Sequence, residues 1–202
     1  MRIKKLIMHN FGVYASTNIL EFKGDKPVVL IGGMNGRGKT TILEAILLSL
    51  YGSNSFAYIE SKYATYGQYL KSFVNKADGS LETFVELEFS MNLGDGEVYN
   101  VKRKWSGKGQ RIHEYISVKK NRENSDFLTE NWLMFIENIL PSALSSFFFF
   151  DGEKIAELAV EDTSEQMKES IKAMLGITVL DTLQSDIERI ISRVSKNNEK
   201  NQ

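Results

Sequence analysis

Residues 33–40 read GMNGRGKT, and this stretch decides the fold. It matches the spacing G-x-x-x-x-G-K-[ST], which is typical of loops that bind phosphate groups. The apolar run PVVLIGG (27–33) precedes it and is predicted to be a buried strand, whereas TTILEAILLSLYG (40–52) follows with the apolar spacing of a helix. Strand, glycine loop and helix in this order predict an α/β fold of the P-loop NTPase class.

Each residue type in the loop has a physical reason. Gly33, Gly36 and Gly38 allow the backbone to bend so that successive N–H groups point at phosphate oxygens, next to the positive end of the following helix. Lys39 is expected to reach the β- and γ-phosphates of ATP as a catalytic charge, and the Thr40 hydroxyl is expected to ligate Mg²⁺. The loop residues expected to bind nucleotide are Asn35, Gly36, Arg37, Gly38, Lys39, Thr40 and Thr41, with solvent exposure as the alternative role for Arg37.

Composition limits the other possibilities. The chain has 202 residues, a formal net charge of −1 and a pI near 6.2, so any DNA-binding surface must be local. The absence of cysteine excludes disulfides and thiolate metal sites. No run reaches the roughly 18 apolar residues that a membrane-spanning helix needs. We therefore expect a cytoplasmic protein without a membrane partner.

The remaining pattern predicts an antiparallel sheet and a helical end. Segments 3–11, 16–23, 83–91, 97–105 and 113–120 have the character of strands, and LTENWLMFIENILP (128–141) has that of a short helix capped by Thr129 or Asn131. From residue 164 onward, apolar residues three and four apart predict the start of a coiled coil, or else an amphipathic helix lying on the domain. We expect a lobe over 1–163 and this helix over 164–202; its seam residues are Leu180, Leu183, Ile187, Ile190 and Val194.

The stretch FFFFDGEKI (147–155) allows more than one interpretation. An apolar run that ends in an acid resembles the second metal-binding strand of an ATPase, with Asp151 on Mg²⁺ and Glu153 orienting water. Alternatively, Asp151 and Glu153 are the N-cap and a first-turn acid of the helix that comes after them.

Four segments carry a resemblance to a known family. GMNGRGKT, with Asn35–Gly36, resembles the P-loop of SMC and SbcC-type ATPase heads, and IKKLIMHNFGVY (3–14) resembles their first strand. FFFDGEKIAELA and IKAMLGITVLDTL resemble their Q-loop region. NFGVY, GGMNGRGKTT and especially FFFFDGEKI resemble the DndD-type subunit of bacterial DNA phosphorothioation (sulfur modification) systems. The resemblance covers essentially the whole chain.

The resemblance implies a function and several residue roles. Asp151 stands where related heads carry a glutamine that contacts the metal and the attacking water, and Lys76 matches a segment that passes near the adenine and ribose. The chain would be the N-terminal lobe of an ABC/SMC-type head, would lack the Walker B strand and the signature motif, and would hydrolyse ATP hardly at all alone. Its partners would be the C-terminal half of the head, a second head joined through ATP, DNA and sulfur-modification subunits.

Two rival functions stay open. One is the ATPase of an SbcC-like DNA repair nuclease, and the other is a nucleotide-gated DNA tether. A basic cluster around Trp105 is a candidate for DNA phosphate contacts, with a solvated hairpin as the alternative. Its members are Lys102, Arg103, Lys104, Lys108 and Arg111.

Overall fold

The computed structural model describes residues 1–22, 28–91, 96–109, 111–149 and 187. The chain divides into two compact units, Met1–Ser145 and Ser146–Gln202, and the first unit holds almost all of the described residues. Asp151, the domain boundary at 163/164 and the seam predicted over 164–202 lie outside the described residues, apart from Ile187, which is helical.

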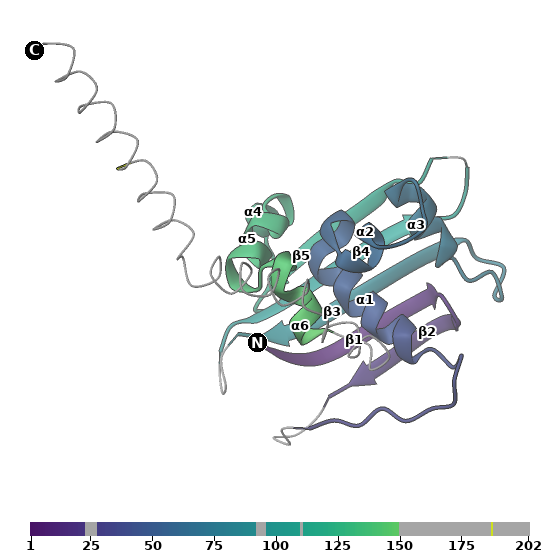
Figure 1. Cartoon of the computed structure of the whole chain (residues 1–202), viewed down its shortest axis with the longest axis horizontal. Coiled ribbons are helices and arrows are strands. Elements are labelled where there is room, and N and C mark those ends of the chain that lie inside the picture. Colours follow the sequence, from purple (N-terminus) through teal and green to yellow (C-terminus); the bar gives the residue numbers. More distant parts are fainter. Residues whose placement is uncertain (23–27, 92–95, 110, 150–186, 188–202) are drawn as a thin grey trace, which may run out of the picture. The chain divides into compact units, whose positions relative to one another are not determined.

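An antiparallel sheet of six strands forms one layer of the first unit, in the order β2-β1-β3-β4-β5-β6 (Figure 1). The fold class is confirmed as an antiparallel sheet combined with helices. Alternating side chains give β1, β3 and β4 one buried face each, whereas β2 has no buried residue. The strands are β1 (Arg2–Phe11), β2 (Tyr14–Glu21), β3 (Glu82–Ser90), β4 (Val98–Ser106), β5 (Glu114–Lys120) and β6 (Glu123–Asn124).

Helices form the second layer. α1 (Lys39–Tyr51) contacts β1, β3 and β4, and α4 (Asp126–Glu130) contacts β5 (Figure 1). Gly52, at φ 56°, ends α1 as predicted. The other helical elements are η1 (Gly52–Asn54), α2 (Phe56–Ile59), α3 (Tyr66–Ser72), α5 (Trp132–Ile139), η2 (Ser142–Leu144) and α6 (Ser145–Phe148).

The core lies between these layers. Leu6, Met8, Val85, Leu87 and Leu48 are fully buried there. The two tryptophans are almost fully buried, and each satisfies its indole N–H through a backbone carbonyl: Trp132 donates to Leu50 O at 2.8 Å and Trp105 to Leu70 O at 3.0 Å. Such bonds remove the cost of burying a polar N–H. The bond from Trp105 ties β4 to α3, and the bond from Trp132 ties α5 to α1.

The predicted strand before the glycine loop is not formed. Residues 28–34 have no strand ladder, and the side chains of Val28, Val29, Leu30 and Ile31 are 66%, 55%, 91% and 45% exposed. A strand needs a neighbour to bond its backbone groups. Within the described residues, the ladders of the sheet join its six strands, and an isolated bridge joins Phe11 to Val74; neither includes segment 28–34. The apolar composition of this segment is therefore not sufficient to make it a strand.

Two helical predictions also change. The helix predicted over 128–141 is two helices, because Ser125 caps α4 and Asn131 (φ −111°, ψ 20°) separates it from α5. Thr129 does not act as a cap; its hydroxyl donates to Ser125 O at 2.8 Å and accepts from Val118 N at 3.0 Å. The start of the phenylalanine run belongs to helix α6 and not to a strand.

Candidate nucleotide-binding site

The glycine loop leads directly into α1. Gly36 and Gly38 have φ of 73° and 95°, which non-glycine residues rarely adopt, and α1 begins at Lys39. Arg37 N donates to Met34 O at 3.3 Å, and Ile42 N donates to Gly38 O at 3.1 Å. The loop therefore turns tightly and places the first backbone N–H groups of α1 at its end, which is the geometry predicted from GMNGRGKT.

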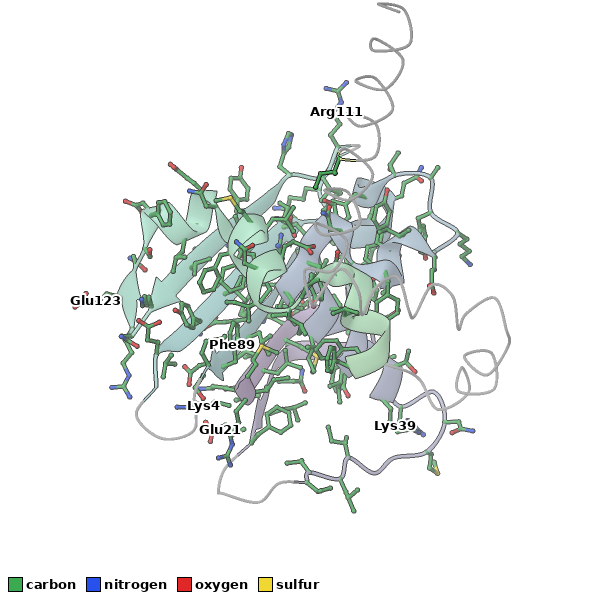
Figure 2. All side chains as sticks on the ribbon, turned by 60° about the vertical axis from the view of Figure 1, so that its left-hand side comes forward. Lys4, Glu21, Lys39, Phe89, Arg111 and Glu123 are labelled. Carbon is green, nitrogen blue, oxygen red and sulfur yellow. The ribbon has the colours of Figure 1, made fainter. Side chains whose placement is uncertain are left out.

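The Lys39 side chain curls back over the loop. Its Nζ donates to Gly33 O at 2.7 Å and to Met34 O at 3.1 Å, and Figure 2 shows Lys39 at the start of α1, next to the glycine loop. Asn35, Arg37 and Thr40 are exposed. The ammonium group is thus held at the loop, where an incoming phosphate would meet it.

The turn between β1 and β2 packs against this loop. A Cβ atom at Gly12 (φ 58°) would lie 2.6 Å from Thr41 Cγ2, so only glycine fits there without movement. Tyr14 donates its hydroxyl to Gly38 O at 3.2 Å, and burial raises the pKa of that hydroxyl. A Cβ at Gly38 would likewise lie 2.7 Å from Val13 Cγ2. The turn therefore forms a wall of the site, although its partners lie more than twenty residues away in the sequence.

Asn10 holds this wall in place. It is fully buried with φ 48°, its Oδ1 accepts from Ser16 N at 2.7 Å, and its Nδ2 donates to the Asp78 carboxylate at 2.9 and 3.0 Å. The hydrogen bond from Asn10 is the main reason that the pKa of Asp78 is lowered. Asn10 therefore has a structural role: it fixes the turn between β1 and β2 in position.

A second asparagine ties the same turn to the segment that carries Lys76. Asn75 donates its Nδ2 to Gly12 O at 2.8 Å, and its backbone N donates to Asn10 O at 2.8 Å. Lys76 comes directly after it, is exposed, and accepts at its carbonyl oxygen from Gly79 N at 3.1 Å. Lys76 thus belongs to a segment that is fixed to the wall of the site, and its expected contact with nucleotide stays a prediction.

The described residues fit Mg·ATP. A Cβ at Gly36 would meet no atom within 4 Å, so the backbone there faces open space that phosphate oxygens can approach. Lys39 supplies a cation and Thr40 a hydroxyl, both on the exposed side of the loop. In the described ranges no three His, Asp or Glu side chains cluster as a metal site, and the expected metal ligand Asp151 lies outside them.

The predicted DNA-binding cluster separates into three environments, and Arg103 is in the core. Its side chain is 8% exposed, its Nη1 lies 3.0 Å from Glu114 Oε2, and its Nε donates to Ser49 O at 3.1 Å. Tyr66 donates its hydroxyl to Glu114 Oε1 at 2.8 Å, and burial together with the Glu114 charge raises the pKa of that hydroxyl. Arg103 has no surface left for DNA, so we exclude it from the DNA-binding set.

Lys102 and Lys104 lie on the other face of β4, among acids. Lys102 Nζ lies 3.4 Å from Glu86 Oε2 and 3.8 Å from the centre of the Phe84 ring, and Lys104 Nζ lies 3.0 Å from Glu82 Oε2. These carboxylates offset the attraction of both lysines for phosphate.

The last two members of the cluster lie beyond the end of β4. Lys108 and Arg111 are exposed, and no ion pair is found for either within the described part of the chain. The cations available to a polyanion are therefore in the connection between β4 and β5, not on β4 itself.

Comparison with known proteins places these features in context. A family model described as an AAA domain matches residues 5–202. The chain is 26% identical over 200 residues to the DNA double-strand break repair Rad50 ATPase of Pyrococcus abyssi, covering 96% of this chain and 20% of that protein. It is 31% identical over 104 residues to the C subunit of the SbcCD nuclease of Treponema pallidum, covering 51% of this chain and 9% of that protein.

The chain thus spans about a fifth of the length of the Rad50 relative. Among solved structures, the SMC head domain from Thermotoga maritima matches 62% of this chain and 39% of that chain, at 21% identity and a TM-score of 0.34. No described helix combines the length and apolar character needed to cross a membrane.

Proposed function

Because this chain belongs to the AAA domain family, we propose that it is the ATP-binding lobe of an SMC/Rad50/SbcC-like ATPase that acts on DNA, in the cytoplasm. The observation that carries the proposal is the loop at 33–40: two glycines at positive φ, the start of α1 and the Lys39 ammonium converge there. The Rad50 and SbcCD relatives support the head type and the link to DNA.

The residues have distinct roles in this proposal. The backbone N–H groups of residues 35–41 bind the phosphates, and Lys39 moves from the Gly33 and Met34 carbonyls to the phosphate oxygens, where its charge offsets the charge of the transition state. Thr40 and Asp151 hold Mg²⁺. When bound, Mg·ATP supplies the phosphoryl group that is transferred to water.

The exposed segment 28–31 supports a partner for this lobe. Four apolar side chains beside the glycine loop and a backbone without ladder bonds are the surface that an added strand would cover. We assign that strand to the C-terminal half of the same head, which would also bring the Walker B acid. Two such heads would then pair through ATP, and the lobe alone would turn over ATP hardly at all, since it contains no LSGGE-like signature.

The process in which the head works has two candidates. The stretch FFFFDGEKI supports DNA phosphorothioation, with sulfur-modification subunits as partners. The similarity to the Rad50 and SbcCD relatives supports a repair nuclease complex at least as well as that stretch supports phosphorothioation. Neighbouring genes separate them: a cysteine desulfurase and a sulfurtransferase support the first, and a metallophosphatase nuclease supports the second. A nucleotide-gated DNA tether would instead retain DNA in the ATP-bound state of a hydrolysis-dead complete protein.

Nucleotide binding is tested with Lys39→Ala in the 202-residue chain. A fluorescent ATP analogue with Mg²⁺ should bind at least about 10-fold more weakly to the variant, because a charge-assisted contact to phosphate contributes about 1.5–3 kcal/mol. Lys119→Ala removes an exposed lysine from β5 and should bind like the original chain. Equal affinities for Lys39→Ala and the original chain, with both folded, would disprove the site.

A further inference from the structure

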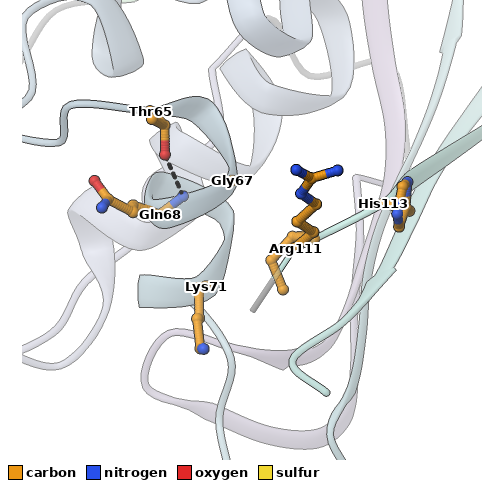
Figure 3. A pocket seen from close by; sticks show the side chains of 7 residues that line it. Thr65, Gly67, Gln68, Lys71, Arg111 and His113 are labelled. Carbon is orange, nitrogen blue, oxygen red and sulfur yellow. Dashed lines mark hydrogen bonds between the residues drawn. The ribbon is translucent and has the colours of Figure 1, made fainter. Parts of the chain in front are cut away.

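A cavity of about 320 Å³ lies between α3 and the segment 111–113, which leads into β5 (Figure 3). Lys71, Arg111 and His113 bring nitrogen donors to it, and none of its lining residues is acidic. We propose that this cavity binds a backbone phosphate of DNA. The inference rests on the proposed action on DNA, and it names the surface involved. The lining residues are Thr65, Gly67, Gln68, Lys71, Arg111, Ile112 and His113.

The two walls of the cavity are fastened to each other. Lys71 Nζ donates to Gly109 O at 3.2 Å, and a Cβ at Gly67 would lie 3.7 Å from Ile112 Cβ. A Cβ at Gly107 would lie 3.0 Å from Val74 Cγ1, so the β4–β5 connection also packs closely against the end of α3. The cations are therefore presented by a formed cleft, which lowers the entropic cost of binding.

The neighbouring acid does not neutralise this cleft. Glu114 comes after His113 in sequence, but its two carboxylate oxygens are used by Arg103 Nη1 at 3.0 Å and by the Tyr66 hydroxyl at 2.8 Å. Arg103 thus contributes to DNA binding only indirectly, by compensating the one carboxylate that adjoins the cleft in sequence. Lys102 and Lys104, in contrast, each lie beside a glutamate.

The chemistry of the cleft suits a phosphodiester. Arg111 offers a planar fork of N–H donors that matches two phosphate oxygens. Lys71 adds a positive charge on the α3 wall; its amine donates to Gly109 O and points away from the Arg111 guanidinium (Figure 3). Thr65 and Gln68 add uncharged polar groups at the rim, where the Thr65 hydroxyl accepts from Gln68 N (Figure 3). Such contacts position a strand without reading its bases, so we expect little sequence preference.

The cleft is separate from the nucleotide site. Figure 2 labels Lys39 and Arg111 in different regions of the molecule, one at the start of α1 and the other beyond the end of β4. Substitutions in the cleft should therefore leave binding of the ATP analogue unchanged.

The test compares two double variants with the same change of charge. Fluorescence anisotropy is measured with a labelled duplex of 20 base pairs and a labelled single strand of 20 nucleotides, between 50 and 200 mM salt. K71Q/R111Q should bind DNA at least about 10-fold more weakly at the lowest salt. With the duplex, the slope of log K against log salt should fall by about 0.9, because the contact with one phosphate is lost. The control K102Q/K104Q should stay within about twofold of the original chain.

Each other outcome overturns the inference in a recognisable way. If K71Q/R111Q binds DNA like the original chain, or if the control loses as much affinity, the cleft is not the DNA surface, and action of the head on DNA would require a different one. If the original chain binds no DNA at 50 mM salt, the DNA part of the proposed function fails as well. If inorganic phosphate shifts the NMR resonances of His113 but K71Q/R111Q does not change the affinity for DNA, the cleft binds free anions and not nucleic acid.

Discussion

Arg103 is the residue on which most of the polar structure around the β4–β5 end depends. Its guanidinium joins Ser49 of α1 to Glu114 of β5 and lies so close to Gly52 that a Cβ there would be 2.6 Å from Nη1. Glu114 in turn holds Tyr66 of α3. Loss of this one cation would leave a largely buried carboxylate without its partner.

Arg103→Ala is therefore expected to lower the free energy of unfolding by about 3–5 kcal/mol, the usual cost of removing one partner from a buried ion pair. Arg111→Ala, the same substitution at an exposed arginine, should change it by less than about 0.5 kcal/mol. Urea denaturation followed by circular dichroism measures both. A small effect at Arg103 would show that Glu114 finds water or another cation.

The burial of Arg103, in contrast to the exposure of Arg111, was partly predictable from the sequence. Alternation along β4 places Arg103 between Val101 and Trp105 on one face and Lys102 with Lys104 on the other, so the burial of Arg103 was readable from its neighbours. Asn10 and Gly12 were not readable in this way. Their partners Asp78 and Thr41 are distant in sequence, and only the folded chain brings them together.

At the scale of the element, the strong periodic signals were reliable. The five long strands and α1 were predicted within a few residues, because a half-buried strand or helix repeats its apolar residues at a fixed spacing. The exposure of segment 28–34, which was predicted to be a buried strand, and the break between α4 and α5 were not predicted. Whether segment 28–34 forms a strand depends on a neighbouring strand, which the segment's own sequence does not reveal. The break between the two helices depends on the Ser125 cap, which starts α4 earlier than the apolar pattern indicates.

Helix α1 carries an acid in an unfavourable place. Burial raises the pKa of Glu44 to about 6, and the Glu44 charge adds to burial in raising the pKa of the Tyr69 hydroxyl. Because the folded-state pKa lies above the ordinary value of 4.5, the protonated carboxyl favours folding. That contribution is complete below about pH 4.5 and is lost as the pH rises through 6.

Glu44→Gln should therefore stabilise the chain at pH 7.5 by about 1 kcal/mol after allowance for partial solvent screening, and should have almost no effect at pH 4.5. Thermal unfolding at the two pH values measures the difference, with Glu123→Gln as a control at an exposed acid. An equal gain at both pH values would mean that packing, and not the charge of Glu44, is responsible.

At the scale of the whole molecule, the first unit packs helices on one face of an antiparallel sheet and leaves the segment before the glycine loop apolar and exposed. The sequence was sufficient to predict the resemblance to SMC and SbcC-type heads, the glycine loop at 33–40 and the antiparallel sheet. The role of Asp151 and the seam over 164–202 stay predictions, because they lie outside the described residues.

Leu30→Lys tests the exposure of that segment. The side chain is 91% exposed, so the substitution should change the unfolding free energy of this chain by less than about 0.5 kcal/mol. Leu48→Ala, in the core, should cost about 2–5 kcal/mol. In a protein that also contains the C-terminal half of the head, Leu30→Lys should impair assembly. A large loss in the 202-residue chain alone would show that Leu30 is already covered.

The strand order gives the sheet two unequal borders. β6 has two residues and exposes few backbone groups, whereas β2 has eight, and no described strand pairs along its outer side. Among the described strands at the borders of the sheet, β2 therefore offers the longest edge to a strand contributed by another chain. A proline or an inward-facing lysine placed on β2 should prevent an oligomer from extending the sheet along this border.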